Sequence, residues 1–152
     1  MCFGAFVAIS RHENTNALKP ACRTGRPTKK IMARHNELGI IGEKAAREYL
    51  KGKGYKILDY NWRFLKDELD IIAEHDNKLV VVEVKTRSSW QYGEPHEAVT
   101  PKKQKFMARA TEAYINEKEI SKEVRFDVIS IVMTGNTVTD LTHIEDAFYA
   151  TM

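Results

Sequence analysis

Cysteine is nearly absent from the sequence, and so are long apolar runs. The two cysteines, Cys2 and Cys22, lie near the start, so residues 32–152 contain none. This distribution excludes a disulfide framework and a cysteine-based zinc site from most of the chain. No apolar stretch approaches the roughly 18 residues that a membrane-spanning helix needs. We therefore expect a cytoplasmic protein without membrane contact, because the apolar start "MCFGAFVAIS" also lacks the preceding Lys or Arg of a secretory signal.

Acidic residues are scarce at the N-terminus. Residues 1–31 hold six Lys or Arg and one acid, Glu13, and they lack the period of a helix or a strand. We interpret this segment as a disordered basic leader, with Met32 as an alternative translation start. Residues 32–152 then form the single compact domain that a chain of this length predicts. Because 20 acids oppose 18 bases in that domain, only a local basic patch could attract a polyanion.

Several common catalytic motifs are missing as well. The five histidines show no paired spacing of the kind that zinc ligands have. No glycine-rich phosphate loop and no serine or cysteine nucleophile motif occurs. These absences argue against a histidine-based metalloenzyme, a P-loop nucleotide hydrolase and a hydrolase of the serine or cysteine type.

From position 36 onward the apolar pattern is that of an α/β protein. Asn36 is a candidate cap for a helix whose apolar residues follow at helical spacing and which Gly52 ends. Thr100 and Pro101 are typical of the cap and first turn of a second helix. The expected elements are a helix at 36–51, strands at 55–64, 68–75 and 78–87, a helix from 101, and strands at 125–134 and 137–144.

Three charged residues occupy strand positions where the pattern predicts hydrophobes, namely Asp70, Glu83 and Lys85. Glu83 and Lys85 share one strand face with Leu79 and Val81, because side chains alternate along a strand. An Asp-Asn turn at 76–77 predicts a hairpin that places Asp70 about as far from the turn as Glu83. The two carboxylates are therefore expected side by side at the polar end of the sheet.

Neighbouring carboxylates repel each other unless a cation lies between them, and hard divalent ions such as Mg²⁺ or Mn²⁺ take oxygen ligands. An adjacent ammonium could position a water molecule and stabilise negative charge on a transferring phosphate. Asp70, Glu83 and Lys85 thus fit a metal-dependent phosphodiesterase site. The alternative is an ordinary Glu83–Lys85 ion pair at a strand end, with Asp70 as a polar residue near the turn.

Basic residues gather at the start of the second expected helix, where exposed N–H groups favour anions. Lys102, Lys103 and Lys105 are therefore expected to contact phosphate groups. Arg63, near the end of the first strand, and Arg87, at the end of the third, are further candidates for nucleic-acid contacts.

A succession of motifs resembles a known family. Asp70 followed by "EVK" is similar to the PD-(D/E)XK nuclease superfamily, whose core has the order αβββαβ. The longer succession resembles the YraN family of small, largely uncharacterised bacterial proteins, which is regarded as endonuclease-like and similar to archaeal Holliday-junction resolvases. The resemblance implies a restriction-endonuclease-like αβββαβ core, with a mixed central sheet flanked by helices. The blocks that carry it are, in order, "NELGIIGEKAAREYLKGKGYKIL", "NWR", "ELDIIA", "VVVEVKTRSS", "YGEPHEAVTPKKQ" and "RFDVISI".

The resemblance also implies roles for individual residues. Asp70, Glu83 and Glu43 would be ligands of Mg²⁺ or Mn²⁺, and Lys85 would be the catalytic lysine. The alternative for Glu43 is an ordinary solvated glutamate of the first helix. Gln104 matches a polar residue that related nucleases place near the site in the second helix, and it is a further candidate for a nucleic-acid contact.

The implied function is that of a metal-dependent endonuclease that cuts branched or otherwise non-duplex DNA in recombination or repair. Two-fold symmetric junctions would suit a homodimer. The alternative is a catalytically inactive nuclease-fold protein that binds nucleic acid or a protein partner. One departure keeps this alternative open, because the family usually has Gly before "E-[IL]-D" and this chain has Asp67. We expect this extra carboxylate near the site, where it would alter the turn or the metal affinity.

Overall fold

A computed structural model describes residues 29–88 and 99–149. The order helix, three strands, helix, two strands is the one that the sequence predicts. The predicted leader, residues 1–31, lies outside the described residues except for its last three, with which the first helix begins. The elements are α1 (Lys29–Gly52), β1 (Lys56–Phe64), β2 (Asp67–His75), β3 (Lys78–Arg87), α2 (Pro101–Lys118), β4 (Val124–Thr134) and β5 (Thr137–Ile144).

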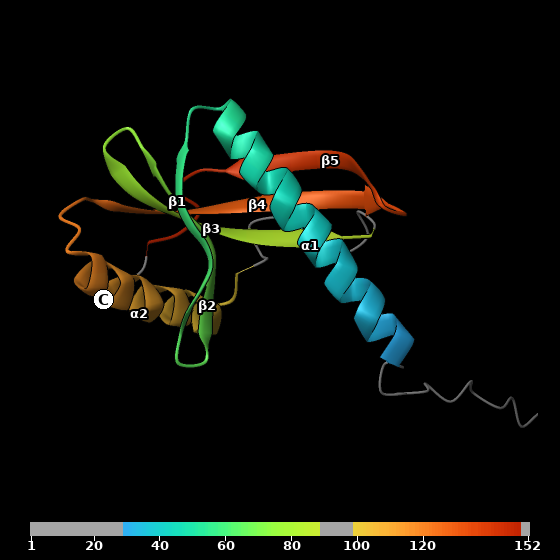
Figure 1. Ribbon diagram of the computed structural model, residues 1–152, viewed down its shortest axis with the longest axis horizontal. Helices are drawn as coiled ribbons and strands as arrows, with labels where there is room; N and C mark the ends of the chain where they lie inside the picture. The colour runs from blue at the N-terminus through green and yellow to red at the C-terminus, as the bar shows by residue number, and fades with distance from the viewer. Residues whose placement is uncertain (1–28, 89–98, 150–152) are drawn as a thin grey trace, which may run out of the picture.

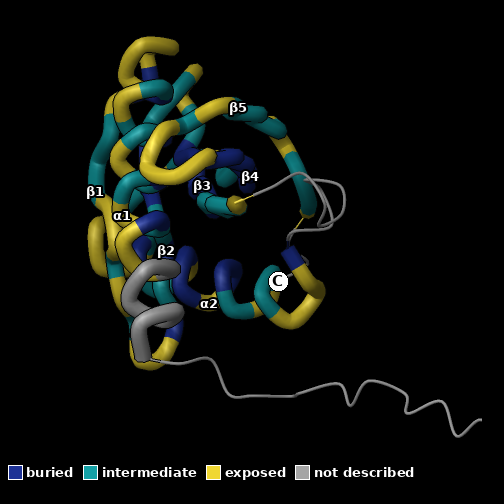
Figure 2. The backbone as a smooth tube through the Cα atoms, turned by 90° about the vertical axis from the view of Figure 1, so that its right-hand side faces the viewer, coloured by how far each residue is buried: buried dark blue, intermediate teal, exposed yellow. Residues whose placement is uncertain are grey.

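The strands form one mixed sheet in the order β1-β2-β3-β4-β5. β3 and β4 are parallel, and the other neighbours are antiparallel. α1 packs on one face of the sheet and α2 on the other (Figures 1 and 2). The predicted αβββαβ fold class, with a mixed sheet flanked by helices, is thus confirmed, and β5 adds an antiparallel edge strand.

β3 and β4 form the centre of the core. Side chains alternate along β3, so Val80 and Val82 pack under α1, whereas Leu79 and Val81 pack under α2. Most of β4 and the first half of β3 are buried, as expected of a parallel pair that is covered on both faces, and Figure 2 shows the buried part of β4 in dark blue. A charged side chain within such a strand is therefore buried and needs a partner of opposite charge.

The β2–β3 hairpin turns at Asp76 and Asn77, as predicted. Both residues have positive φ, 49° and 59°, and His75 pairs with Lys78 across the turn. Asp and Asn tolerate this left-handed conformation better than most residues do, and it matches the twist of the two strands. The two-residue turn fixes the register of the hairpin and thereby aligns its far end.

α1 begins at Lys29, so the predicted cap at Asn36 is wrong. Residues 29–35 contain neither Gly nor Pro and several good helix formers, so nothing stops the helix before Asn36. At the other end α1 stops at Gly52, as predicted. Gly42 lies so near β3 that a Cβ atom added to it would be 2.0 Å from Thr86 Oγ1. This close approach positions α1 against the end of β3.

A buried charge network holds the opposite end of the sheet together. Asp127 is fully buried and accepts two hydrogen bonds from Arg125, at 2.9 and 2.8 Å, and one from the Asp146 amide at 3.0 Å. His143 Nε2 lies 2.9 Å from the same carboxylate, and Arg125 also donates to the Tyr55 hydroxyl at 2.7 Å. Both oxygens of Asp127 are thus satisfied, as burial of a charge requires.

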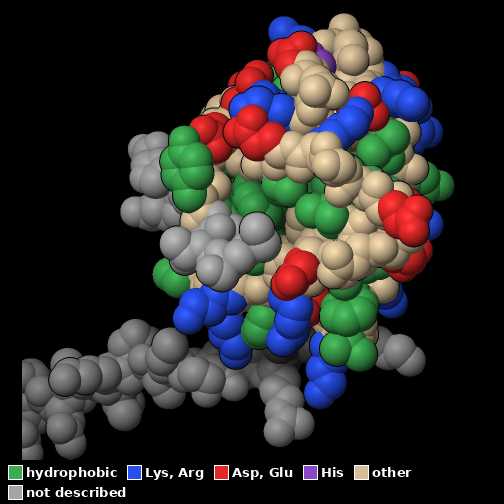
Figure 3. All heavy atoms as spheres, turned by 90° about the vertical axis from the view of Figure 1, so that its left-hand side faces the viewer, with side chains coloured by type: hydrophobic (Ala, Val, Ile, Leu, Met, Phe, Trp, Pro, Cys, Tyr) green, Lys and Arg blue, Asp and Glu red, His purple; other side chains and the backbone are tan. Residues whose placement is uncertain are grey.

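Charged side chains of both signs are spread over the surface. On the face seen in Figure 3, acidic and basic side chains are mixed in the upper part, and basic ones gather along the lower edge. None of the helices within the described ranges is long and apolar enough to cross a membrane.

Candidate active site

The candidate site lies where β2 and β3 separate. Their antiparallel pairing ends at Ile71 and Val82. Beyond this point the side-chain alternation of β2 is interrupted, because Leu69 packs in the cluster under α2 whereas Ile71 packs in the cluster under α1. Asp70 stands between them, and its Oδ2 accepts a hydrogen bond from the Val84 amide at 2.8 Å. The carboxylate thus satisfies a backbone donor beyond the end of the β2–β3 pairing.

Glu83 is the buried centre of the site, with a side chain that is 2% exposed. Lys85 Nζ lies 2.6 Å from its Oε1, and Lys103 Nζ, from the first turn of α2, lies 2.9 Å from its Oε2. The Glu83 carboxylate thus has one ammonium group at each of its oxygens. The Glu83–Lys85 ion pair of the alternative interpretation is therefore present, but Asp70 and a second lysine accompany it.

Burial and like charge make Asp70 difficult to ionise. Burial, and then the charge of Glu83, raise the pKa of Asp70 to about 7, against the opposing effects of the Val84 amide and Lys103. Burial alone would lower the pKa of Lys103, but the carboxylates of Glu83 and Asp70 raise it above its ordinary value. Lys103 is therefore charged near neutral pH and offsets part of the negative charge of the site.

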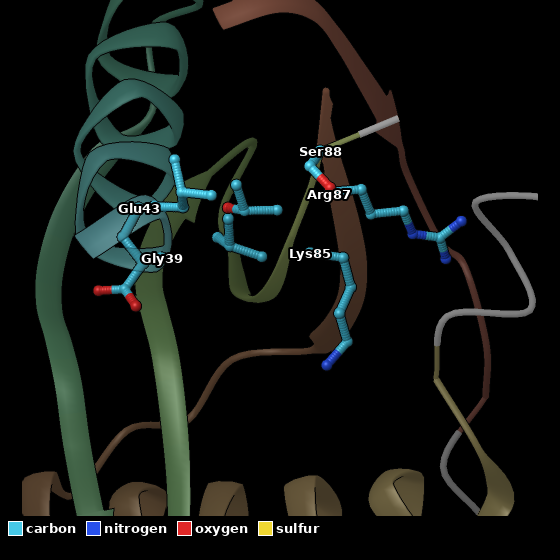
Figure 4. A pocket seen from close by; sticks show the side chains of 8 residues that line it. Gly39, Glu43, Lys85, Arg87 and Ser88 are labelled. Atoms are coloured by element: carbon cyan, nitrogen blue, oxygen red, sulfur yellow. The ribbon is translucent and has the colours of Figure 1, made fainter. Parts of the chain in front are cut away.

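Glu43 approaches the site from α1. Together with Lys85 it lines a hollow of about 650 Å³ between α1 and the end of β3. Figure 4 shows the two side chains on opposite walls, with Arg87 pointing away from both. The charge of Glu43 adds to the rise in the pKa of Asp70. No three carboxylate, imidazole or thiol groups in the described part of the chain are grouped to hold one ion, so Glu43 borders the carboxylate pair without completing a compact ligand set.

The two carboxylates fit a hard divalent ion. Glu83 Oε2 is buried, with the Lys103 ammonium as its partner in the described part of the chain, and Asp70 is fixed by the Val84 amide through Oδ2. Carboxylate oxygens are the ligands that Mg²⁺ and Mn²⁺ take, and Mg²⁺ in particular is often held by one or two carboxylates, with water and substrate phosphate in the other positions. The residues present would therefore hold Mg²⁺ or Mn²⁺ through Asp70 and Glu83.

The predicted phosphate contacts on α2 are divided between surface and interior. Lys102 and Lys105 are exposed in the first turns of the helix, whereas Lys103 turns inward to the carboxylates. Gln104 is used locally, because its Nε2 donates a hydrogen bond to the carbonyl of Val99 at 3.1 Å. Only two of these four side chains therefore point to solvent from the start of α2.

The two arginines predicted to contact nucleic acid lie on different strands. Arg63 is exposed on β1 and forms an ion pair with Glu68 of β2 at 3.2 Å. Arg87 is the last residue of β3 and lines the hollow that Glu43 borders. Arg63 thus lies on the β1–β2 hairpin, and Arg87 lies at the rim of the hollow.

Asp67, the extra carboxylate expected near the site, is paired with an arginine of α2. Its carboxylate is buried and accepts hydrogen bonds from Nε of Arg109, at 2.9 Å, and from Nη2 of the same guanidinium. Arg109 belongs to α2, so this ion pair ties the start of β2 to the helix. An arginine 42 positions away in the sequence thus neutralises the extra carboxylate.

Sequence reasoning missed the inward orientation of Lys103. Three lysines of the same helix start had been assigned one role, contact with phosphate. Helical spacing could have separated them, because Lys103 lies four residues before Met107 and seven before Ala110, both of which are buried. Lys102 and Lys105 do not share that stripe.

Comparisons with known proteins all find the same family. The family model described as "Uncharacterised protein family UPF0102" matches residues 42–131, which include both carboxylates and both lysines of the site. A "UPF0102 protein" of Flavobacterium johnsoniae is 48% identical over 122 residues, which cover 78% of this chain and 98% of the relative. Proteins of the same description from Christiangramia forsetii and Bacteroides thetaiotaomicron are 47% and 49% identical, over 78% of this chain and 98% and 97% of their own.

Proposed function

This chain belongs to the uncharacterised protein family UPF0102, the YraN family that its motifs resemble, and we propose that it is a divalent-metal-dependent DNA endonuclease. One observation carries the proposal. Asp70 and Glu83 meet at the opening between β2 and β3, and the Lys85 ammonium lies 2.6 Å from Glu83. Two carboxylates and a lysine at the open end of a strand pair are the groups that metal-dependent phosphodiester hydrolysis needs.

Each side chain of the site has a proposed task. Asp70 and Glu83 would bind Mg²⁺ or Mn²⁺, which when bound supplies Lewis-acid activation of the phosphodiester. Lys85 would orient the attacking water and stabilise the charge that develops on the phosphate oxygens in the transition state. Glu43 would act from the opposite wall of the hollow through water and not by direct ligation.

The proposed substrate is branched or otherwise non-duplex DNA, in recombination or repair. Support comes from the resemblance of the motifs and of the αβββαβ order to PD-(D/E)XK nucleases and archaeal Holliday-junction resolvases. Lys102 and Lys105 are exposed at the start of α2, where basic side chains and helix N–H groups favour phosphate. A homodimer would match the two-fold symmetry of a four-way junction, and the cytoplasm is the proposed location.

Binding without cleavage is the second candidate function. It is favoured by the occupation of both Glu83 oxygens by the ammonium groups of Lys85 and Lys103. Above pH 7, where Asp70 is ionised as well, two negative and two positive side chains balance without any metal. A protein that only binds nucleic acid, or another protein, could keep this balanced arrangement unchanged.

Incubation with labelled linear, flapped and four-way DNA, with and without Mn²⁺, tests the proposal. We expect cleavage of the flapped or four-way DNA by the wild-type protein in Mn²⁺ only, and none by Asp70→Asn. Binding to these DNAs without cleavage would support the second function. Equal cleavage by wild type and Asp70→Asn would contradict the assigned site.

A further inference from the structure

Lys103 connects the buried carboxylate of Glu83 to the surface of α2. We infer that its ammonium is an exchangeable internal cation, which neutralises Glu83 in the metal-free protein and moves to a nucleic-acid phosphate when a divalent ion takes its place. This inference rests on the proposed function, whose carboxylate pair it shares. It adds that metal binding and nucleic-acid binding are coupled through one side chain.

The first step of the argument is charge balance. Glu83 is 2% exposed, and a buried carboxylate is costly unless cations or hydrogen bonds compensate it. Lys85 and Lys103 supply those cations, one at each oxygen. A divalent ion at Glu83 and Asp70 would add two positive charges to a site that is already balanced. One ammonium must therefore leave the carboxylates for the ion to bind well.

The second step identifies which ammonium leaves. Lys85 is two residues from Glu83 on the same strand and lies 2.6 Å from Oε1. Lys103 reaches Glu83 from a different element, α2, and its Nζ lies farther from the carboxylate, at 2.9 Å from Oε2. The longer contact, made from a separate element, is the one that an ion of higher charge replaces more readily. The lysine side chain is long and has several rotamers, which allows its ammonium to turn outward without moving the helix.

The third step concerns the destination of the released ammonium. The Lys103 side chain is 31% exposed, and its neighbours Lys102 and Lys105 already point to solvent. Its own backbone N–H is held by the cap, because it donates to Thr100 Oγ1 at 3.3 Å, so the first turn of α2 stays formed. A phosphate beside the site would thus meet a third cation only after the metal has bound. By linkage, each ligand then raises the affinity for the other by the same factor.

The test compares Lys103→Met, which keeps most of the aliphatic stem, with Lys105→Met, a matched change on the exposed side of the same helix. Calorimetric titration with Mn²⁺ at pH 8, without DNA, measures the metal affinity. Fluorescence anisotropy of labelled four-way DNA, with and without Ca²⁺, measures the effect of a hard divalent ion on DNA affinity. Lys103→Gln serves as a second variant in case the thioether side chain impairs folding.

We expect Lys103→Met to bind Mn²⁺ about fivefold more tightly than wild type and to lose the gain in DNA affinity that Ca²⁺ produces. Lys105→Met should keep the wild-type Mn²⁺ affinity and the Ca²⁺-dependent gain, with weaker DNA binding throughout. An unchanged or weaker Mn²⁺ affinity in both Lys103 variants would overturn this inference alone. Absence of Mn²⁺ binding in the wild-type protein would overturn it together with the proposed metal site.

Discussion

Asp70 Oδ2 accepts a hydrogen bond from the Val84 amide at 2.8 Å, across the opening between β2 and β3. One carboxylate therefore does two things. It satisfies a backbone N–H beyond the last β2–β3 pair, and it brings a negative charge next to Glu83. An asparagine could accept the same hydrogen bond but could not carry the charge. Replacement of Asp70 by Asn thus separates the contribution to the fold from the contribution to the chemistry.

Asp70→Asn should stabilise the metal-free protein at alkaline pH. The pKa of Asp70 is raised to about 7 by burial and by Glu83, whereas an unfolded aspartate titrates near 3.9. The folded state therefore holds a proton that the unfolded state loses, so wild-type stability falls as pH rises from about 4 to about 7. Asparagine does not titrate. We expect a melting temperature on the order of a few degrees above wild type at pH 8, and a difference that shrinks toward pH 4.

The same variant should lose the rise in melting temperature that Mn²⁺ gives the wild-type protein. Glu48→Gln is a suitable control, because Glu48 is an exposed residue of α1 that pairs with Lys51 and not with a residue of the site. Destabilisation by Asp70→Asn that is independent of both pH and metal would show that the carboxylate is structural.

Lys85→Ala should keep metal binding and lose turnover. Its proposed role is in the transition state, so its removal leaves both carboxylates as ligands. We expect Mn²⁺ to raise the melting temperature of this variant at least as much as that of wild type, and cleavage of four-way DNA to fall by about 100-fold or more. If Glu83 and Lys85 form only a structural pair, the variant should be destabilised to the same extent with and without Mn²⁺.

The sequence was sufficient to predict the order of the elements and the meeting of Asp70 with Glu83, because both depend on short-range signals. The turn at Asp76 and Asn77 fixes the hairpin register, and side-chain alternation then places Asp70 and Glu83 on the same face of the sheet. The start of helix α2 was also predicted from the sequence, because Thr100 is its N-cap and accepts a hydrogen bond from the Lys103 amide.

Other features depend on partners far apart in the chain, and no local pattern reveals them. Asp67 and Arg109 are 42 positions apart, so nothing near Asp67 shows that its charge is neutralised. Asp127 meets His143 only because β4 and β5 are neighbours in the sheet. The start of α1 differs from the predicted one for a local reason. Asn36 is a residue type that often caps helices, but no residue between Lys29 and Asn36 interrupts the helix.

Asp67→Ala should weaken the fold and leave the metal site intact. The carboxylate is buried against the Arg109 guanidinium, which is about half exposed, so the pair is only partly shielded from water. We expect a loss of about 1 kcal/mol in unfolding free energy, and an Mn²⁺ affinity within about twofold of wild type. A double-mutant cycle with Arg109→Ala should assign most of the loss to the pair. A large change in Mn²⁺ affinity would place Asp67 in the site after all.

Asp127→Asn should reduce stability strongly at neutral pH and little in acid. Burial alone would raise the pKa of Asp127, but hydrogen bonds from His143, Arg125 and the Asp146 amide lower it below the ordinary value. The stabilisation is therefore complete above about pH 4 and is lost as pH falls through the lower folded pKa. We expect the unfolding free energy, measured with urea, to be about 3 kcal/mol lower than that of wild type at pH 7. Below about pH 4 this difference from wild type should become smaller. Asp140→Asn, at a half-buried aspartate, is the control. An equal loss of unfolding free energy in this control, or a difference between Asp127→Asn and wild type that persists in acid, would contradict this account.

Gly42→Ala should displace α1 from the sheet, because the added Cβ would lie 2.0 Å from Thr86 Oγ1. Inside a helix alanine is more favourable than glycine by about 1 kcal/mol, so a net loss of unfolding free energy would have to come from the clash. We expect a net destabilisation of about 1–3 kcal/mol in urea unfolding, of the size found for overpacked cores. Gly39→Ala on the same helix, with nothing within 4 Å of its added Cβ, should be neutral or stabilising. The double variant Gly42→Ala/Thr86→Ala should recover most of the loss, and a double variant no more stable than Gly42→Ala would show that Thr86 is not the obstacle.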